Sequence, residues 1–297
     1  MIDLHAHILS GMDDGAKTIE ESIRMCLISY RDGVRTIVAT PHTLNGLYIN
    51  DRATILTKVQ ELNEAISSQL PSALSLGPSA ISSDLQSAIP GLCSAEQTSL
   101  GRNPQSAIGL NSELRTPNSE LPLRILPGAD VRFCEDILHQ LDAGKVTTIG
   151  DGRHFLSIEF PFQGIPYRAE EVLFQLMTRG IVPIISHPER NLEIVERPKR
   201  YYEMIRMGCL GQVTAMSLTG KFGHGIRKIA ERFIKKRLVH IIASDAHSIN
   251  GRPPILSEAL RAAEKIVGKE EAWKMVSDHP RAILEGRRPK VPEPIPL

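Results

Sequence analysis

The chain has 297 residues, of which 41% are hydrophobic, and a net charge of +1. This length and apolar content are enough for one large α/β domain or two small ones. The near-neutral balance, without a dense stripe of Lys and Arg, argues against nucleic acid as an obligate partner. No apolar run approaches the length of about 20 residues that spans a bilayer. The chain opens on a strand pattern, so we expect neither a secretory signal nor membrane insertion.

The four cysteines are too widely scattered to suggest a disulfide framework or a zinc motif. They are Cys26, Cys93, Cys134 and Cys209. We interpret them as reduced thiols and expect a cytoplasmic protein. The sequence gives no indication of the oligomeric state.

Predicted strands and helices alternate along the chain. Thr18 and Glu21 have the spacing of a capping box, and the helix that they open ends at Gly33. Further helices are predicted over Arg168–Arg179 and Lys199–Met207, each followed by a glycine. The seven predicted strands are Ile2–His7, Thr36–His42, Leu123–Asp130, Phe155–Phe160, Val182–Pro188, Cys209–Ala215 and Val239–His247.

Sustained strand–helix alternation predicts an α/β fold with a parallel sheet, open or closed. The β-branched runs in the predicted strands are nearly continuous, as in parallel strands covered on both faces. Six strands end in residues that can bind metal. A barrel draws its active site from every strand at one rim, whereas an open sheet concentrates chemistry near one switch point. The pattern therefore favours a barrel-like closure.

Two segments differ in composition from the rest. Residues 67–122 are rich in Ser, Pro, Gly, Asn and Gln and repeat the tetrapeptide Asn-Ser-Glu-Leu. Such a segment buries too little apolar surface to offset the entropy of ordering it. We predict a disordered insertion between the second helix and the third strand, with a substrate lid as the alternative. Residues 287–297 are proline-rich and predicted to be extended, and a peptide-recognition role is the alternative.

The first and last predicted strands each carry a pair of potential metal ligands. The pairs are His5 with His7 and Asp245 with His247. Because side chains alternate along a strand, each pair faces one side. The pairs meet if the terminal strands are neighbours. Imidazole and carboxylate groups hold Zn, Mn or Fe, so the pattern predicts a metalloenzyme. For either pair alone, polar surface residues are the alternative.

Other potential ligands lie at strand ends or, for Asp14, in the turn after the first strand. The triplet of residues 13–15 is by itself only a turn signature, but one of its two carboxylates can reach a metal there. The full set exceeds the coordination of one ion, which indicates two or three ions that share carboxylates. Mixed imidazole and carboxylate ligands suit Mn, Fe or Zn better than Mg or Ca. The nine candidate ligands are His5, His7, Asp14, His42, Asp130, Glu159, His187, Asp245 and His247.

Arg190 follows the candidate ligand His187 in the motif His-Pro-Glu-Arg. A guanidinium can grip two phosphate oxygens at once, so we predict that Arg190 binds a substrate phosphate. A local salt bridge is the alternative. Arg252 either holds its loop or touches substrate. Cys-x5-Arg, Walker A and Gly-x-Gly-x-x-Gly signatures are absent, which leaves hydrolysis by metal-activated water.

Together these motifs resemble those of the bacterial PHP-family tyrosine phosphatases, the manganese-dependent CpsB-type enzymes of capsule and exopolysaccharide loci. The resemblance covers most of the chain apart from the insertion and the tail. It is carried by residues 1–18, 33–42, 127–130, 157–160, 185–190, 242–247 and 251–254.

The resemblance implies a distorted seven-stranded (β/α)7 barrel over residues 1–286 and a cluster of metal ions, most simply Mn²⁺, with Fe or Zn as alternatives. It implies a substrate on the phosphotyrosine-bearing tail of a bacterial tyrosine kinase that controls polysaccharide export. It also implies direct catalytic roles for Arg190, Asp14 and His42. The implied ligand sets are His5, His7, Asp130 and Asp245 for one ion; Asp130, Glu159 and His187 for a second; and Asp14, His42 and His247 for a third.

One residue departs from the family pattern. The bridging carboxylate is usually Glu, but here it is Asp130, which is shorter by one methylene. The insertion is a second departure, because it directly precedes the strand that carries Asp130 and could disturb its register. Two other functions stay open. One is a small-molecule phosphatase of the same superfamily, such as a histidinol-phosphate phosphatase. The other is a non-catalytic domain whose metal site has decayed.

Overall fold

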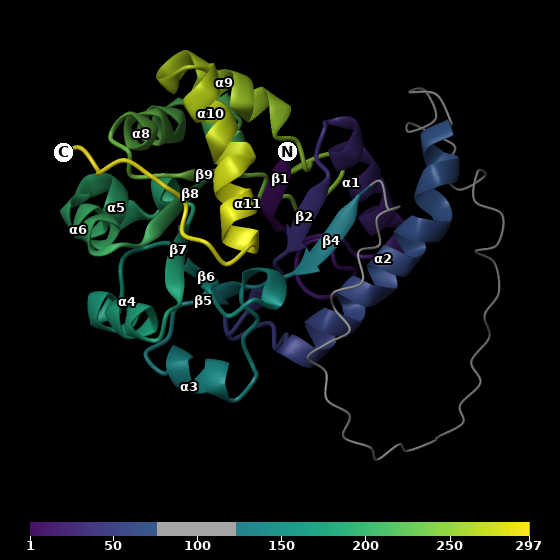
Figure 1. Ribbon diagram of the computed structural model, residues 1–297, viewed down its shortest axis with the longest axis horizontal. Helices are drawn as coiled ribbons and strands as arrows, with labels where there is room; N and C mark the ends of the chain where they lie inside the picture. Colours follow the sequence, from purple (N-terminus) through teal and green to yellow (C-terminus); the bar gives the residue numbers. More distant parts are fainter. Residues whose placement is uncertain (76–122, 297) are drawn as a thin grey trace.

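Parallel strands alternate with helices in the structure, as the sequence predicts. The computed structural model describes residues 1–75 and 123–296 (Figure 1). All strand pairings among these residues are parallel, so the predicted α/β class is confirmed. The strands are β1 (Ile2–Ala6), β2 (Thr36–Ala39), β3 (His42–Thr43), β4 (Arg124–Pro127), β5 (Asp130–Arg132), β6 (Phe155–Glu159), β7 (Val182–Ser186), β8 (Leu210–Thr214) and β9 (Ile241–Ala243).

The helices begin and end largely where local signals place them. The Thr18 side chain accepts a hydrogen bond from the Glu21 amide at the start of the first helix, which confirms the predicted cap. The α-helices are α1 (Ile19–Arg31), α2 (Arg52–Ser75), α3 (Ile137–Asp142), α4 (Ala169–Thr178), α5 (Leu192–Glu196), α6 (Lys199–Met207), α7 (Ala215–Thr219), α8 (His224–Lys235), α9 (Ser257–Val267), α10 (Lys269–Val276) and α11 (Asp278–Leu284), and short 3-10 turns cover Ile149–Asp151 and Pro188–Arg190.

The strands form two sheets, with orders β1-β2-β4 and β3-β5-β6-β7-β8-β9. Two predicted strands are each divided, Thr36–His42 into β2 and β3 and Leu123–Asp130 into β4 and β5. Pro41 cannot donate a ladder hydrogen bond at the first break. At the second break, a Cβ on Gly128 would lie 2.5 Å from Val38 Cγ1. Closure into one seven-stranded barrel is therefore not confirmed.

The two ends of the strand series lie side by side. A parallel bridge joins Ala6 to Ala246, and the Asp245 amide donates to the His5 carbonyl over 2.8 Å. The predicted adjacency of the terminal strands is thus confirmed. The last strand is shorter than predicted, however, because β9 ends at Ala243 and Asp245 has a left-handed φ of 53°.

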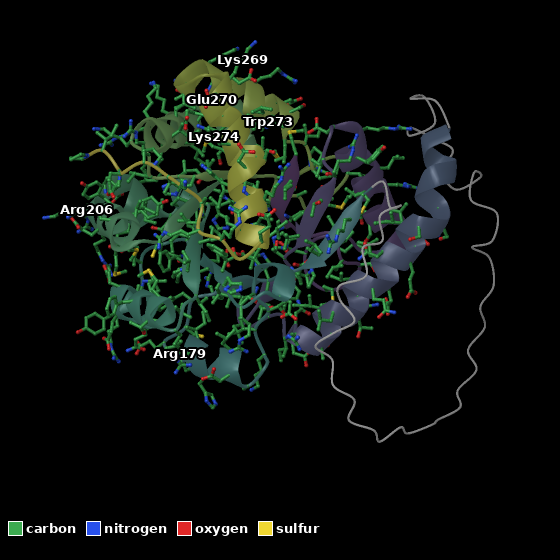
Figure 2. All side chains as sticks on the ribbon, viewed as in Figure 1. Arg179, Arg206, Lys269, Glu270, Trp273 and Lys274 are labelled. Atoms are coloured by element: carbon green, nitrogen blue, oxygen red, sulfur yellow. The ribbon has the colours of Figure 1, made fainter. Side chains whose placement is uncertain are left out.

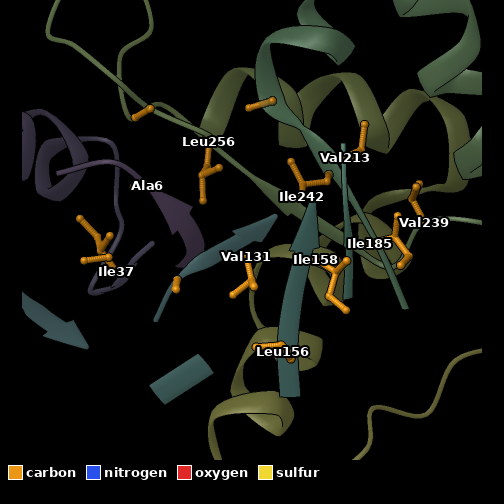
Figure 3. Close-up of a cluster of buried hydrophobic side chains, with 14 of the residues drawn as sticks. Ala6, Ile37, Val131, Leu156, Ile158, Ile185, Val213, Val239, Ile242 and Leu256 are labelled. Atoms are coloured by element: carbon orange, nitrogen blue, oxygen red, sulfur yellow. The ribbon is translucent and has the colours of Figure 1, made fainter. Parts of the chain in front are cut away.

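Apolar side chains of neighbouring strands make up a shared core beneath the helices. Figure 3 shows Val131, Ile158, Ile185, Val213 and Ile242 from β5 to β9, and all five are fully buried. Successive side chains on a strand point to opposite faces. The strands β5 and β6 therefore bury apolar residues on one face and present the neighbouring carboxylates on the other.

Helix α2 continues through Ser75, beyond the predicted start of the insertion at residue 67, and residues 76–122 lie outside the described chain. The C-terminal tail is extended and held against the body, since the Ile295 amide donates to the Lys236 carbonyl over 2.9 Å. Cys26, Cys134 and Cys209 are unpaired, while Cys93 is outside the described residues. Among the helices of residues 1–75 and 123–296, none has the length and apolar character to cross a bilayer.

Candidate metal centre

The side chains predicted as metal ligands come together at the carboxyl ends of the strands. The potential ligands form three groups, and within each group the ligand atoms all lie within 4.8 Å of one another. The groups share members, so they form one continuous cluster. They consist of His7, Asp14, His42 and His247; His5, His7 and Asp245; and His42, Asp130 and Glu159.

His187 lies at the edge of this cluster. Its Nε2 is 3.9 Å from Glu159 Oε1, and its ring centroid is 6.0 Å from that of His5. All nine candidate ligands therefore converge. The grouping differs in part from the one implied by the resemblance, because His42 lies close to Asp130 and Glu159 as well as to Asp14. The assignment of residues to individual ions stays a prediction.

Two ligands are aimed by unusual backbone conformations at strand ends. His187 has a φ of 34° and Asp245 a φ of 53°, both in the left-handed region that non-glycine residues rarely adopt. Such conformations persist where the surrounding structure enforces them, often at functional sites. A third constraint is Gly15, where a Cβ would lie 2.1 Å from the His7 carbonyl oxygen. The turn that carries Asp14 thus requires glycine at this position.

Asp130 supplies the most direct test of whether a cation fits. Its Oδ1 accepts a hydrogen bond from Ser186 Oγ over 2.8 Å. Its Oδ2 is buried without a hydrogen bond to any described residue, and so is the neighbouring His42 Nδ1. These two atoms are 3.5 Å apart, and Oδ2 lies 3.8 Å from His5 Nε2. Buried polar atoms without partners are costly. A metal ion held by these residues would satisfy them, so the donor set fits.

Asp13 and Gln212 orient two of the histidines, a role that the sequence did not assign to them. Asp13 Oδ2 lies 2.6 Å from His7 Nδ1, and Gln212 Oε1 lies 2.9 Å from His5 Nδ1. Both Nε2 atoms therefore face the cluster, 3.1 Å apart. Partners of this kind fix the tautomer and ring orientation of metal-binding histidines.

The protonation states of two histidines also suit a divalent cation, whereas at His42 the neighbouring Asp130 outweighs burial and raises the pKa to about 9. Burial lowers the pKa of His187 to about 3 and that of His247 to about 2. Both rings are thus neutral at pH 7 and keep a lone pair for a metal. Burial alone would raise the pKa of Asp130 and Asp245, but electrostatic interactions with neighbouring basic side chains, that with His5 foremost, outweigh it and hold both values well below the usual range. Ionised carboxylates therefore lie beside the neutral rings of His187 and His247.

Three arginines border the cluster. Arg190 Nη1 is 2.8 Å from Asp245 Oδ2, the salt bridge that the sequence left as an alternative role. Arg252 Nη2 is 2.5 Å from the same oxygen, which places this residue at the centre. Arg132 Nη1 is 3.1 Å from Glu159 Oε2 and was not predicted. Its position two residues after Asp130 on β5 could have indicated it, since both side chains then face one side.

A cavity of about 130 Å³ opens beside Arg132, Arg190 and His187. Its walls combine cations with apolar and aromatic side chains, and Phe162 is 56% exposed at its border. The lining residues are Arg132, Glu159, Phe160, Phe162, Ser186, His187, Arg190, Asn191 and Ile194.

The remaining histidines lie apart from the centre, as expected. His240 and His279 are buried, and each ring accepts or donates a hydrogen bond with backbone. In the described part of the chain, His139, His154 and His224 belong to none of the candidate ligand groups.

Comparison with known proteins places this centre in a family. The model for capsular polysaccharide synthesis proteins CpsB/CapC matches residues 1–101 and 109–285. The chain is 31% identical over 287 residues to the tyrosine-protein phosphatase YwqE of Bacillus subtilis (strain 168), covering 97% of this chain and 92% of the relative. It is 28% identical to the tyrosine-protein phosphatase CpsB of Streptococcus pneumoniae, covering 96% and 98%.

A solved structure agrees with these relatives. It comes from crystal structures of YwqE from Bacillus subtilis and CpsB from Streptococcus pneumoniae, described as unique metal-dependent tyrosine phosphatases. The TM-score is 0.80 at 30% sequence identity, and the alignment covers 100% of this chain and 99% of that one. On its sequence and its structure, the chain belongs to the CpsB/CapC family of capsular polysaccharide synthesis proteins.

Proposed function

We propose that the chain is a metal-dependent protein-tyrosine phosphatase that hydrolyses the phosphate ester of phosphotyrosine. The convergence of nine imidazole and carboxylate side chains into one cluster is the observation that carries this proposal. The activity named for the relatives and the metal dependence named for the solved structure support it.

Two or three ions are the proposed cofactor, Mn²⁺ first and Fe or Zn as alternatives. When bound, such ions supply Lewis acidity and a nucleophilic water at neutral pH. The mixture of imidazole and carboxylate donors supports a transition metal over Mg or Ca. Asp130, although shorter than the usual Glu, directs a free Oδ2 toward His42 and His5. This arrangement favours a working site over a decayed one.

The arginines are the proposed phosphate-binding groups. Arg190 and Arg252 share one oxygen of Asp245, so a substrate phosphate in the cluster would lie within reach of both. Planar guanidinium groups hold phosphate oxygens in pairs. Asp14 is 54% exposed and lies 3.6 Å from His42, at the open side of the cluster. We assign Asp14 and His42 to the reacting end of the substrate. Tyrosinate has a pKa of about 10, so its departure needs little acid assistance.

The adjoining cavity is the proposed site for the phenyl ring. Its apolar walls come from Phe160, Phe162 and Ile194, and aromatic rings pack well against such side chains. A flexible polar substrate such as histidinol phosphate would gain less from these contacts. The cavity therefore favours the tyrosine phosphatase over the small-molecule alternative.

Two further proposals concern the fold and the partner. We propose that the two sheets are parts of one distorted seven-stranded barrel, in which β2 with β3 and β4 with β5 are halves of single strands. The bridge between Ala6 and Ala246 supports this view. We also propose that the substrate is the phosphotyrosine-bearing tail of a bacterial tyrosine kinase, which the family's link to capsule synthesis supports.

An assay with added Mn²⁺ tests the function. Rates on a phosphotyrosyl peptide and on histidinol phosphate are compared, with Glu159→Gln as the inactive control. The peptide should be strongly preferred, and Phe162→Ala should raise KM for the peptide more than for histidinol phosphate. A clear preference for histidinol phosphate would overturn the substrate class. Fewer than two ions per chain, together with no activity on added Mn²⁺, would instead support the decayed site.

A further inference from the structure

Helices α7, α8 and α9 enclose a groove of about 550 Å³ that the proposed chemistry does not use. Charged side chains dominate its lining, with four basic residues and two acidic ones. The charged lining residues are Arg227, Arg261, Lys265, Lys269, Glu258 and Glu264.

The positive charge of this groove is not neutralised within the described chain. Arg261, Lys265 and Lys269 are exposed and form no ion pair with any residue in the described ranges. Lys269 projects from the end of the molecule that α9 and α10 form (Figure 2). Residues 215–276 hold twelve Lys and Arg against six Asp and Glu, in a chain whose net charge is +1. Uncompensated cations around a groove attract anionic ligands.

A short series of contacts connects the groove to the metal centre. Both Arg190 and Arg252 lie over the ring of Phe222, at 5.1 and 5.8 Å from its centroid. The residue before it in the chain, Lys221, forms an ion pair of 3.2 Å with Glu258, which lines the groove. One extended peptide could therefore occupy the metal centre and the groove together.

We propose that this groove binds a second phosphotyrosine of the same peptide substrate, so that the preferred substrate is a multiply phosphorylated segment. The inference rests on the proposed phosphatase function. Arg261 and Lys265 are four residues apart on α9, so their side chains neighbour each other on one face of the helix. A phosphate offers three oxygens and about two negative charges at pH 7. Two adjacent cations suit this group better than they suit a single carboxylate.

The test measures binding without turnover, so that it does not depend on catalysis. Fluorescent peptides carry one or two non-hydrolysable phosphonate analogues of phosphotyrosine, at a series of spacings, and are titrated with the full chain loaded with Mn²⁺. At the best spacing the double analogue should bind about fivefold more tightly, since exposed ion pairs are individually weak but a tethered second group binds at high effective concentration. Added salt should reduce this advantage.

Charge reversal separates the groove from the metal centre. In the double variant Arg261→Glu with Lys265→Glu, the advantage of the second analogue should disappear while the single analogue binds as before. Hydrolysis of p-nitrophenyl phosphate should also be unchanged. Lys145→Glu is the matched control, because Lys145 is exposed and forms no ion pair within residues 1–75 and 123–296, and α3, which it follows, lies on the opposite side of the molecule from α9 (Figure 1). The Lys145→Glu variant should still bind the double analogue more tightly than the single one, by the same factor as the unmodified protein.

Three results would overturn the inference. One is equal affinity for single and double analogues at every spacing, and another is an advantage that survives the double charge reversal. The third is competition by other polyanions. If an acidic oligosaccharide or an oligonucleotide displaces the second phosphonate as effectively as a free phosphotyrosine peptide does, the groove is a general polyanion site. Failure of the phosphatase proposal would look different, as absent hydrolysis of every aryl phosphate.

Discussion

Replacement of Asp13 by Asn should weaken metal binding without removing any metal ligand. The carboxylate of Asp13 accepts from the amides of Gly15 and His42, each over 2.9 Å, and lies 2.6 Å from His7 Nδ1. Burial alone would raise its pKa, but His7 outweighs this effect and keeps the group ionised. An Asn side chain offers one oxygen and one NH₂ group. In either orientation the NH₂ group of Asn faces at least one N–H donor, so at least one of these hydrogen bonds is lost.

The magnitude follows from these contacts. Hydrogen bonds to a charged group contribute about 1.5–3 kcal/mol, and we expect the variant to lose about 2 kcal/mol of unfolding free energy. Loss of the partner that orients a metal-binding histidine typically lowers metal affinity 10- to 100-fold. The Mn²⁺ concentration that gives half-maximal hydrolysis of p-nitrophenyl phosphate should therefore rise by about that factor. Activity at saturating Mn²⁺ should largely recover.

Asp32→Asn provides the matched control. Asp32 Oδ2 accepts from the amides of Leu256 and Ser257 over 2.7 and 2.9 Å, away from the centre. An Asn oxygen can still accept both bonds at this position, so this variant should lose less stability than the Asp13 variant, and its dependence on Mn²⁺ should stay that of the unmodified protein. If the Asp13 and Asp32 variants show the same half-saturating Mn²⁺ concentration, the reasoning about His7 orientation is refuted.

Three other outcomes can be checked directly. Gly211→Ala should destabilise the fold by more than about 3 kcal/mol, because the added Cβ would lie 2.1 Å from Tyr201 Oη and 2.4 Å from the Leu238 carbonyl; a melting temperature within a degree or so of the original would contradict this. Removal of metal with a chelator should abolish hydrolysis and lower the melting temperature, and Mn²⁺ should restore both, since ligands that bind the native state stabilise it; an unchanged melting curve would count against a shared metal at the cluster. Arg190→Lys keeps the charge but loses the planar fork, so KM for a phosphotyrosyl peptide should rise about tenfold; an unaltered KM would exclude Arg190 from phosphate binding.

Much of the centre was predictable because strand periodicity determines side-chain direction. His5 and His7 lie at alternate positions at the end of β1, and Asp130 and Glu159 come from neighbouring strands. Nearly continuous apolar runs identified those strands, and parallel strands bring their carboxyl ends to one side. The ligand positions therefore followed from the sequence pattern with little further information.

Other features depend on contacts between distant segments. The Asp-Asp-Gly turn does not reveal that Asp13 turns inward to His7 while Asp14 stays half exposed, because the backbone amide of His42 helps to decide it. Gln212 lies in β8 without a motif, and its role appears only once β8 is near β1. The length of α2 was underestimated for a different reason. Residues 67–75 have the polar composition of the following segment, yet they continue a helix that begins at Arg52.

The held C-terminal tail has a practical consequence for handling the protein. Composition suggests that the chain could be shortened at Gly286, where proline-rich sequence begins. However, Arg288 donates to the Gly208 carbonyl, Val291 packs against a cluster of buried apolar side chains that includes Phe155, and the Ile295 amide donates to the Lys236 carbonyl. A shortened protein would expose the surfaces that the tail covers. An affinity tag at the C-terminus could disturb the contacts that hold the tail in place. An N-terminal tag would in turn crowd the buried first strand, so a long flexible spacer is advisable at either end.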